Sequence, residues 1–140
     1  MKKFAVLSVV FCMVAVFSAG CATTGKGASD AELIQQRIAE GIAAIKAKNF
    51  DAFDGMVSDN FSSGAVGDKQ DLMDYLKNAD DMGFLDDIEI DLADAETVIE
   101  GETATVSPVT ASGSFGSLGL EFTGVKEKGV WVVSGVEPGF

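Results

Sequence analysis

The sequence predicts an α+β fold of three N-terminal helices followed by a bent antiparallel sheet. Apolar residues recur at helical spacing as far as Gly83, and beyond it apolar and polar residues alternate. The apolar positions change parity at Pro108, and a proline cannot donate a hydrogen bond to a sheet ladder. This slip predicts a β-bulge or a sharp bend in the longest strand. Helices followed by a bent meander of strands give the α+β plan.

The first helix is predicted to begin at a capping box of Ser29 and Glu32 and to end at about Lys48. In this motif each side chain accepts a hydrogen bond from a free backbone amide of the first turn. One face of the helix is apolar, as expected for a helix that covers a core. This face consists of Leu33, Ile34, Ile38, Ile42 and Ile45.

Two shorter helices are predicted next. Asn49 caps the second helix, which carries Phe50, Phe53, Met56 and Val57 and leaves through Phe61. The third helix begins at Asp68 and ends near Gly83, where a glycine suits a left-handed helix terminus. The residues predicted to point inward from the third helix are Leu72, Tyr75, Leu76 and Ala79.

The strands are predicted at residues 88–92, 97–100 and 103–115, then from residue 118 and at residues 130–136. In the first of them, apolar residues alternate with acidic ones, which predicts one buried face and one solvated face. Turns are predicted at Gly101, at Gly116 with Ser117, and at Lys128 with Gly129.

Residues 1–20 have the pattern of an export signal. Lys2 and Lys3 precede an apolar run at residues 4–17, which is shorter than the about 20 residues that a transmembrane helix needs. The small residues 18–20 before Cys21 resemble the lipobox of bacterial lipoproteins. The resemblance implies that residues 1–20 are removed and that diacylglycerol is attached to the Cys21 sulfur. It also implies that the new amino end can carry a further acyl chain such as palmitate.

The residue after the cysteine, Ala22, implies by the same resemblance an outer-membrane lipoprotein that faces the periplasm. Residues 21–28 then form the lipidated cysteine and a short flexible tether, and residues 29–140 form a single domain. An ordinary secretory signal and an uncleaved anchor helix are the alternatives.

Charge and composition exclude several classes of function. The net charge of −12 becomes −14 once Lys2 and Lys3 are removed, so nucleic acid and anionic headgroups are repelled. Solubility explains this charge, and an acidic recognition face is the alternative. Cys12 leaves with the signal, Cys21 carries lipid and the chain has no histidine, so no disulfide, metal site or cofactor is expected. The acidic stretch at residues 80–91 lacks the ligand spacing of an EF-hand, and weak cation binding there is the alternative.

The order of elements resembles the nuclear transport factor two-like superfamily, which has a cystatin-like cone and includes the SnoaL-like proteins. The stretch between Phe61 and Gly67 is shorter than the first hairpin of that family. The resemblance implies that the three helices pack on the concave face of a strongly curved, cone-shaped antiparallel sheet, and that this cone often holds a small hydrophobic molecule. The matching segments are residues 48–51, 58–61, 101–106 and 129–137 and the helix from Gly67, within residues 31–137.

Enzymes that this chain resembles use a histidine with an aspartate, or a tyrosine with acidic partners, for proton transfer. This chain has one tyrosine, Tyr75, which is more simply explained as a buried ring. Asp54 and Asp74, near the inward faces of their helices, are the remaining weak candidates for a general base. The sequence therefore favours binding over catalysis. The residues predicted to line a ligand pocket are Phe53, Leu76, Phe122 and Trp131.

The last strand is apolar on both faces, with Trp131 and Val133 on one and Val130 and Val132 on the other. The second face is predicted to meet another subunit or an envelope protein, or to be covered by a C-terminal segment. Three functions follow: a binding module for a small apolar ligand or a peptide, an assembly lipoprotein, and, least supported, a cofactor-free isomerase or dehydratase. A binding cone is expected to enclose a void of about a few hundred Å³.

Overall fold

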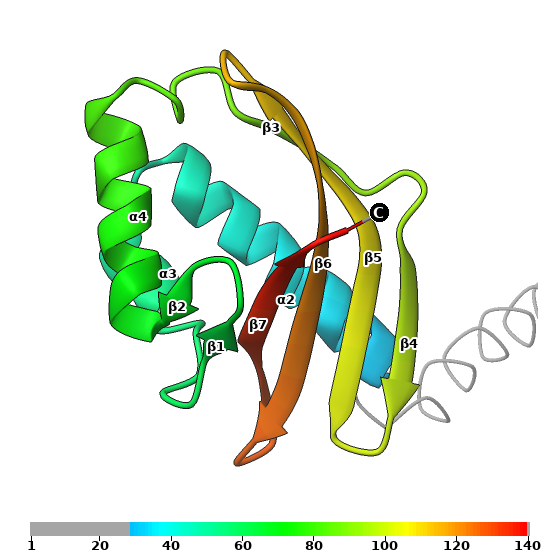
Figure 1. The fold of residues 1–140 in the computed structure, drawn as a ribbon. Helices are drawn as coiled ribbons and strands as arrows, with labels where there is room; N and C mark the ends of the chain where they lie inside the picture. Colours follow the sequence, from blue (N-terminus) through cyan, green and yellow to red (C-terminus); the bar gives the residue numbers. More distant parts are fainter. Residues whose placement is uncertain (1–28, 140) are drawn as a thin grey trace, which may run out of the picture.

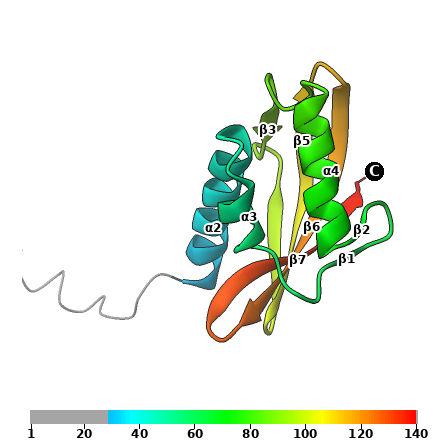
Figure 2. The same ribbon diagram turned by 90° about the vertical axis from the view of Figure 1, so that its left-hand side faces the viewer.

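The computed structural model describes residues 29–139 and confirms the predicted α+β fold. In Figures 1 and 2, α2 lies against one face of a curved sheet, and α4 stands beside it near the short hairpin. The helices are α2 (Asp30–Lys46), α3 (Phe50–Asp54) and α4 (Lys69–Asp81). The hairpin is formed by β1 (Ser62–Ser63) and β2 (Gly67–Asp68). The sheet contains β3 (Glu89–Asp91), β4 (Glu96–Glu100), β5 (Thr103–Gly113), β6 (Gly116–Glu127) and β7 (Val130–Pro138).

The predicted helix starts are confirmed by their caps. The Ser29 amide donates to Glu32 Oε2 over 2.8 Å, and the Glu32 amide donates to Ser29 Oγ over 3.3 Å. Asp68 and Asp71 form a second capping box at α4, and the Asn49 side chain caps α3 by accepting a hydrogen bond from the Ala52 amide. These bonds satisfy amides that the first helical turn leaves without a partner, so they fix where each helix begins.

The inward face of α4 differs from the prediction at one position. Met73 is buried, whereas Tyr75 is 60% exposed, so the prediction that Tyr75 points inward is wrong. Both residues lie at the margins of the apolar stripe that Leu72 and Leu76 define. A flexible methionine fills an irregular gap between helices, whereas a buried tyrosine needs a partner for its hydroxyl.

The central strand of the sheet is β5, which pairs with β6 along one edge and with β3 and then β4 along the other. The pairing of β5 with β6 shifts between Val106 and Val109, which confirms the irregularity predicted at Pro108. Because of this shift, Ala104 and Ala111 are both buried on the concave face despite their opposite parity. A second shift, which was not predicted, lies between Thr123 and Gly124 in the pairing of β6 with β7.

The turn between β5 and β6 was predicted two residues too late. Gly113 pairs with Gly116, so Ser114 and Phe115 form the turn and Gly116 is the first residue of β6. Gly116 has a φ of +103°, a conformation that favours glycine. It adopts this conformation as the first residue of β6 and not as a residue of the turn. The predicted turn at Lys128 and Gly129 connects β6 to β7.

Two clusters of buried residues hold the domain together. The helix core joins α2, α3 and α4, and the sheet core lies between α2 and the sheet. The helix core consists of Ala44, Phe53, Val57, Phe61, Leu72, Met73 and Leu76. The sheet core consists of Ile34, Ala104, Val106, Val109 and Trp131. Residues 29–139 thus provide a core of their own, as expected for a domain that folds independently.

The export signal, Cys21 and the tether lie outside the described residues. Within residues 29–139, no helix combines the length and the apolar character required to cross a bilayer.

Candidate functional site: a narrow apolar cavity

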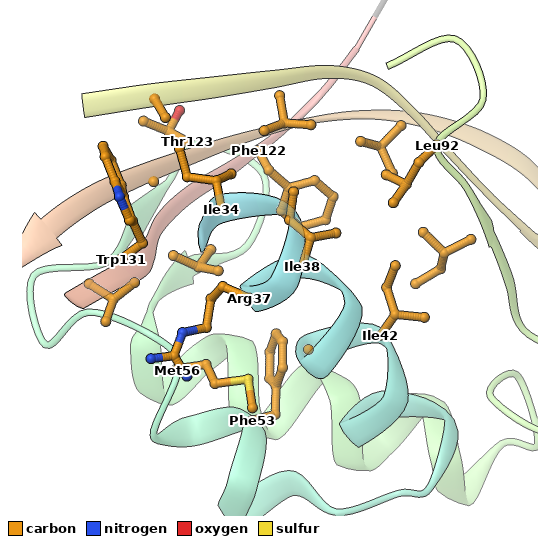
Figure 3. A pocket seen from close by; sticks show the side chains of 18 of the residues that line it. Ile34, Arg37, Ile38, Ile42, Phe53, Met56, Leu92, Phe122, Thr123 and Trp131 are labelled. Atoms are coloured by element: carbon orange, nitrogen blue, oxygen red, sulfur yellow. The ribbon is translucent and has the colours of Figure 1, made fainter. Parts of the chain in front are cut away.

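A cavity lies between α2, α3 and the concave face of the sheet, and we call it the cone cavity. Ile34, Ile38 and Ile42 line it from successive turns of α2, and Figure 3 shows them on the side that faces Phe122 and Leu92. The cavity has a volume of about 80 Å³. It exists because a straight helix crosses a sheet that curves away from it, leaving space between the helix core and the sheet core.

The wall of the cone cavity is almost entirely apolar. Among the described residues that line it, Arg37 has the one charged side chain and Thr123 the one hydroxyl group. The Arg37 guanidinium donates to Glu40 Oε2 over 3.2 Å. An apolar wall with one cation at its margin suits the binding of an apolar group, and it places no carboxylate in the lining for proton transfer.

The volume is smaller than the sequence analysis anticipated. Sites for drug-sized ligands measure about 300–1,000 Å³, whereas the cone cavity measures about 80 Å³. The aromatic rings of Phe53, Phe122 and Trp131 and the thioether of Met56 take up space around it. The cavity therefore accommodates a slim group better than a bulky ring system.

One end of the cavity is held by a polar latch of Asp30, Lys126 and Trp131. Asp30 Oδ1 accepts hydrogen bonds from Lys126 Nζ at 2.8 Å and from Trp131 Nε1 at 3.1 Å. Lys126 Nζ also lies 5.9 Å from the centroid of the Trp131 ring, which allows a cation–π contact. The hydrogen bond from Lys126 and then that from Trp131 lower the pKa of Asp30, and burial opposes them. The latch ties the first turn of α2 to β6 and β7.

The predicted pocket residues separate into two groups. Phe53, Phe122 and Trp131 line the cone cavity. Leu76 does not line it but is buried in the helix core under α4. Leu76 belongs to the cluster that joins α4 to α3 and to Ala44 of α2, and no residue of α4 lines the cone cavity.

The weak catalytic candidates lie outside the cone cavity. The Asp54 side chain is 50% exposed and lies 3.4 Å from Lys69 Nζ. Asp74 is exposed and accepts a hydrogen bond from Gln70 at 3.2 Å. Tyr75 is exposed, and neither it nor these two carboxylates lines the cavity.

The predicted interface residues differ in their surroundings. Val130 is 44% exposed at the start of β7, whereas Val132 is half-buried and lines the cone cavity. Val130 also borders a surface hollow of about 240 Å³, which we call the outer hollow. The outer hollow is lined by Leu33, Gln36, Arg37, Glu40, Gly129, Val130 and Trp131. The sequence did not predict the outer hollow, nor that Arg37 lines both the hollow and the cavity. Arg37 is charged and was therefore not counted with the apolar face of α2.

The acidic stretch at residues 80–91, which begins in the last turn of α4, has a local structural role. Lys48, at the junction of α2 and α3, forms 2.6 Å ion pairs with Asp80 and Asp86. These contacts, chiefly that with Asp80, raise the pKa of Lys48 above its usual value. No group of three or more acidic, histidine or cysteine side chains within residues 29–139 is arranged to hold a metal ion.

The arrangement of helices over a curved sheet recurs in solved structures. A protein of unknown function with a cystatin-like fold from Nostoc punctiforme PCC 73102 has a TM-score of 0.65 and 15% identity, covering 80% of this chain and 91% of its own. A nuclear transport factor two-like protein of unknown function from Pseudomonas putida KT2440 has a TM-score of 0.60 and 14% identity, with 79% and 87% covered. The CaMKII hub of S. rosetta has a TM-score of 0.63 and 19% identity, with 81% and 98% covered.

Neither a protein-family model nor a curated protein matches the sequence. At these levels of identity, the likeness to solved structures concerns the fold. The domain has the nuclear transport factor two-like, cystatin-like fold that the sequence predicted.

Proposed function

We propose that this chain is a lipid-anchored protein of the bacterial envelope whose domain binds a small apolar ligand, without catalysis, in the cone cavity. The observation that carries the binding proposal is the cavity itself, about 80 Å³ with an almost wholly apolar wall. Burying an apolar group there removes its surface from water, which contributes about 25 cal/mol per Å².

The chemistry of the wall favours binding over isomerase or dehydratase activity. A general base must lie within hydrogen-bonding reach of the proton that it abstracts. Asp54 and Asp74, the carboxylates that sequence analysis singled out, are outside the lining. The indole N–H of Trp131 is engaged by Asp30 at 3.1 Å, so it is already used in the latch.

The binding proposal can be tested with intrinsic fluorescence, because Trp131 is the single tryptophan of the chain and lines the cavity. The domain beginning at Ala22 is titrated with 1-octanol, and we expect a saturable change in Trp131 emission. Ile42→Phe adds bulk inside the cavity and should remove the change. Ala43→Phe places the same ring on the exposed side of the same helical turn and should preserve it. Equal binding by both variants would contradict binding in the cone cavity.

The anchor is proposed from residues 1–21, in which a positive start, a short apolar run and small residues precede Cys21. Two or more acyl chains make such attachment stable. Mass spectrometry of the membrane fraction should find diacylglycerol on Cys21, and Cys21→Ser should release the domain or leave the precursor uncleaved. Cys12→Ser is the matched control and should leave the modification intact. An unmodified Cys21 thiol in the native protein would refute the anchor, and density-gradient separation of membranes would test the proposed outer-membrane location.

Docking of a protein partner through the sheet is the second candidate, and the observation that favours it is exposed valine on two strands. Val98 on β4 is 53% exposed and Val130 on β7 is 44% exposed. If Val130 lies at a contact between two copies of the chain, sedimentation of the domain should detect a dimer that Val130→Asp disrupts. Because Val132 lines the cone cavity, Val132→Asp would test both the cavity and the sheet contact. A monomer at all concentrations would contradict pairing between copies.

A further inference from the structure

The shape of the cone cavity narrows the class of ligand, and this inference rests on the proposed function. The wall supplied by α2 extends from Ile34 to Ile45, which is about 16 Å along the helix axis at about 1.5 Å per residue. A volume of about 80 Å³ spread over that length gives a mean cross-section of about 5 Å² for the centre of an entering atom. Such a channel admits one unbranched hydrocarbon chain and excludes fused rings.

One end of this channel is polar and opens beside the outer hollow. Arg37 and Trp131 line both spaces, so the two spaces adjoin at these residues. Figure 3 shows the Arg37 guanidinium near Met56 on the side of Trp131, with Ile42 and Leu92 toward the other end. An amphiphile could therefore place its tail in the channel and its headgroup in the outer hollow of about 240 Å³.

Arg37 determines which headgroup fits. Its guanidinium has five N–H donors in a planar fork that suits a carboxylate, and one nitrogen is engaged by Glu40 at 3.2 Å. The Arg37 side chain is 30% exposed, so its remaining donors can be reached from the outer hollow. The net negative charge of the domain disfavours anions at long range, but salt screens that repulsion over about 8 Å at physiological ionic strength.

We infer that the ligand is a single-chain carboxylate amphiphile of the fatty-acid type, with its chain along α2 and its carboxylate on Arg37. Glu40 competes with that carboxylate for the guanidinium, and Gln36, which donates to Glu40 Oε1 at 3.1 Å, lies in the same hollow. The arrangement gives Arg37 and Glu40 opposite effects on the affinity for an anion. The affinity for an apolar ligand without a charged headgroup would depend much less on either residue.

The test compares decanoic acid with 1-decanol, each below its aggregation concentration, by calorimetry and Trp131 fluorescence on the domain beginning at Ala22. We expect the affinity for the acid to rise about fourfold per added methylene until the channel is filled. Arg37→Gln should weaken binding of the acid about tenfold, as expected for loss of a charge-assisted hydrogen bond. Glu40→Gln should strengthen it severalfold, and both variants should change the affinity for 1-decanol much less than the affinity for the acid.

Control variants distinguish the loss of the Arg37 charge from an effect on folding, and they distinguish failure of the carboxylate inference from failure of the proposed function. Lys46→Gln removes the same charge from an exposed site at the end of α2 and should leave the affinity for the acid unchanged. Arg37→Lys keeps the charge but loses the planar fork and should have an intermediate effect. Binding of the acid and the alcohol that ignores Arg37 and Glu40 would overturn the carboxylate inference while leaving the proposed function intact. If neither the acid nor the alcohol binds, both the carboxylate inference and the proposed function are refuted.

Discussion

Gly41 offers a direct test of the space beside α2, because it is a buried glycine in the interior of a helix and lines the cone cavity. A Cβ atom added there would lie 3.6 Å from Phe53 Cε2 and 3.9 Å from Met56 Sδ, which are ordinary van der Waals contacts. Gly41→Ala should therefore fit without moving the backbone. The helix gains about 1 kcal/mol from the better propensity of alanine, and burial of the methyl group contributes up to about 0.8 kcal/mol.

We expect Gly41→Ala to raise the free energy of unfolding by about 1.5 kcal/mol in urea denaturation. The melting temperature should rise by about 5 °C for a domain of this size. Ala39→Gly, on the exposed side of α2, reports helix propensity alone and should cost about 1 kcal/mol. A Gly41→Ala variant that is less stable than the native domain would show that the space beside Phe53 is not available, and the account of the cavity would be wrong.

Gly41→Ala also links stability to binding. The added methyl group takes up space in the cone cavity, so the same variant should bind a linear ligand more weakly while being more stable. Opposite changes in stability and affinity are expected where a glycine keeps a site open at a cost to the helix. A destabilised variant could lose affinity through partial unfolding, but a stabilised one could not.

Three further predictions concern residues around the cavity. Asp30→Asn should flatten the acid limb of the stability profile: the folded pKa of Asp30 is lowered, so its contribution is complete above its ordinary value of 3.8 and is lost as the pH falls through the folded value. Urea denaturation at several pH values, followed by Trp131 emission, measures this, and an unchanged acid limb would contradict the latch. Leu76→Ala should cost about 2–4 kcal/mol on unfolding yet leave ligand affinity unchanged, since Leu76 is buried away from the cavity. Tyr75→Phe should change stability by less than about 0.5 kcal/mol because the ring is 60% exposed, and a larger loss would mean that its hydroxyl has a buried partner.

Local chemistry explains why the helix boundaries could be predicted. The capping box of Ser29 and Glu32 uses residues three apart, so its geometry is contained in one turn. The irregularity at Pro108 could also be predicted from the sequence, because proline removes a backbone hydrogen-bond donor whatever the tertiary context. The turn at Ser114 and Phe115 could not be predicted in this way, since the register of Gly113 with Gly116 depends on the whole length of β5 and β6.

The candidate site was only partly predictable because its parts are brought together across the chain. Aromatic residues such as Phe53 and Trp131 could be assigned to an interior from the sequence, and they line the cavity. The latch could not, because Asp30 and Trp131 are 101 residues apart and only the packed fold brings them within hydrogen-bonding distance. Leu76 has the same apolar pattern as a pocket residue, but α4 packs on the other helices and turns Leu76 into the helix core.

The stripe of isoleucines on α2 shows most clearly what tertiary structure adds. Ile34, Ile38 and Ile42 occupy equivalent helical positions, yet Ile34 is 5% exposed while Ile38 and Ile42 are half-buried. The helix advances in a straight line, whereas a β-bulge increases the twist of a strand and bends it. The register shifts in β5 with β6 and in β6 with β7 therefore carry the sheet away from part of the stripe. The same hydrophobic pattern packs tightly where the two surfaces meet and lines a channel where they diverge.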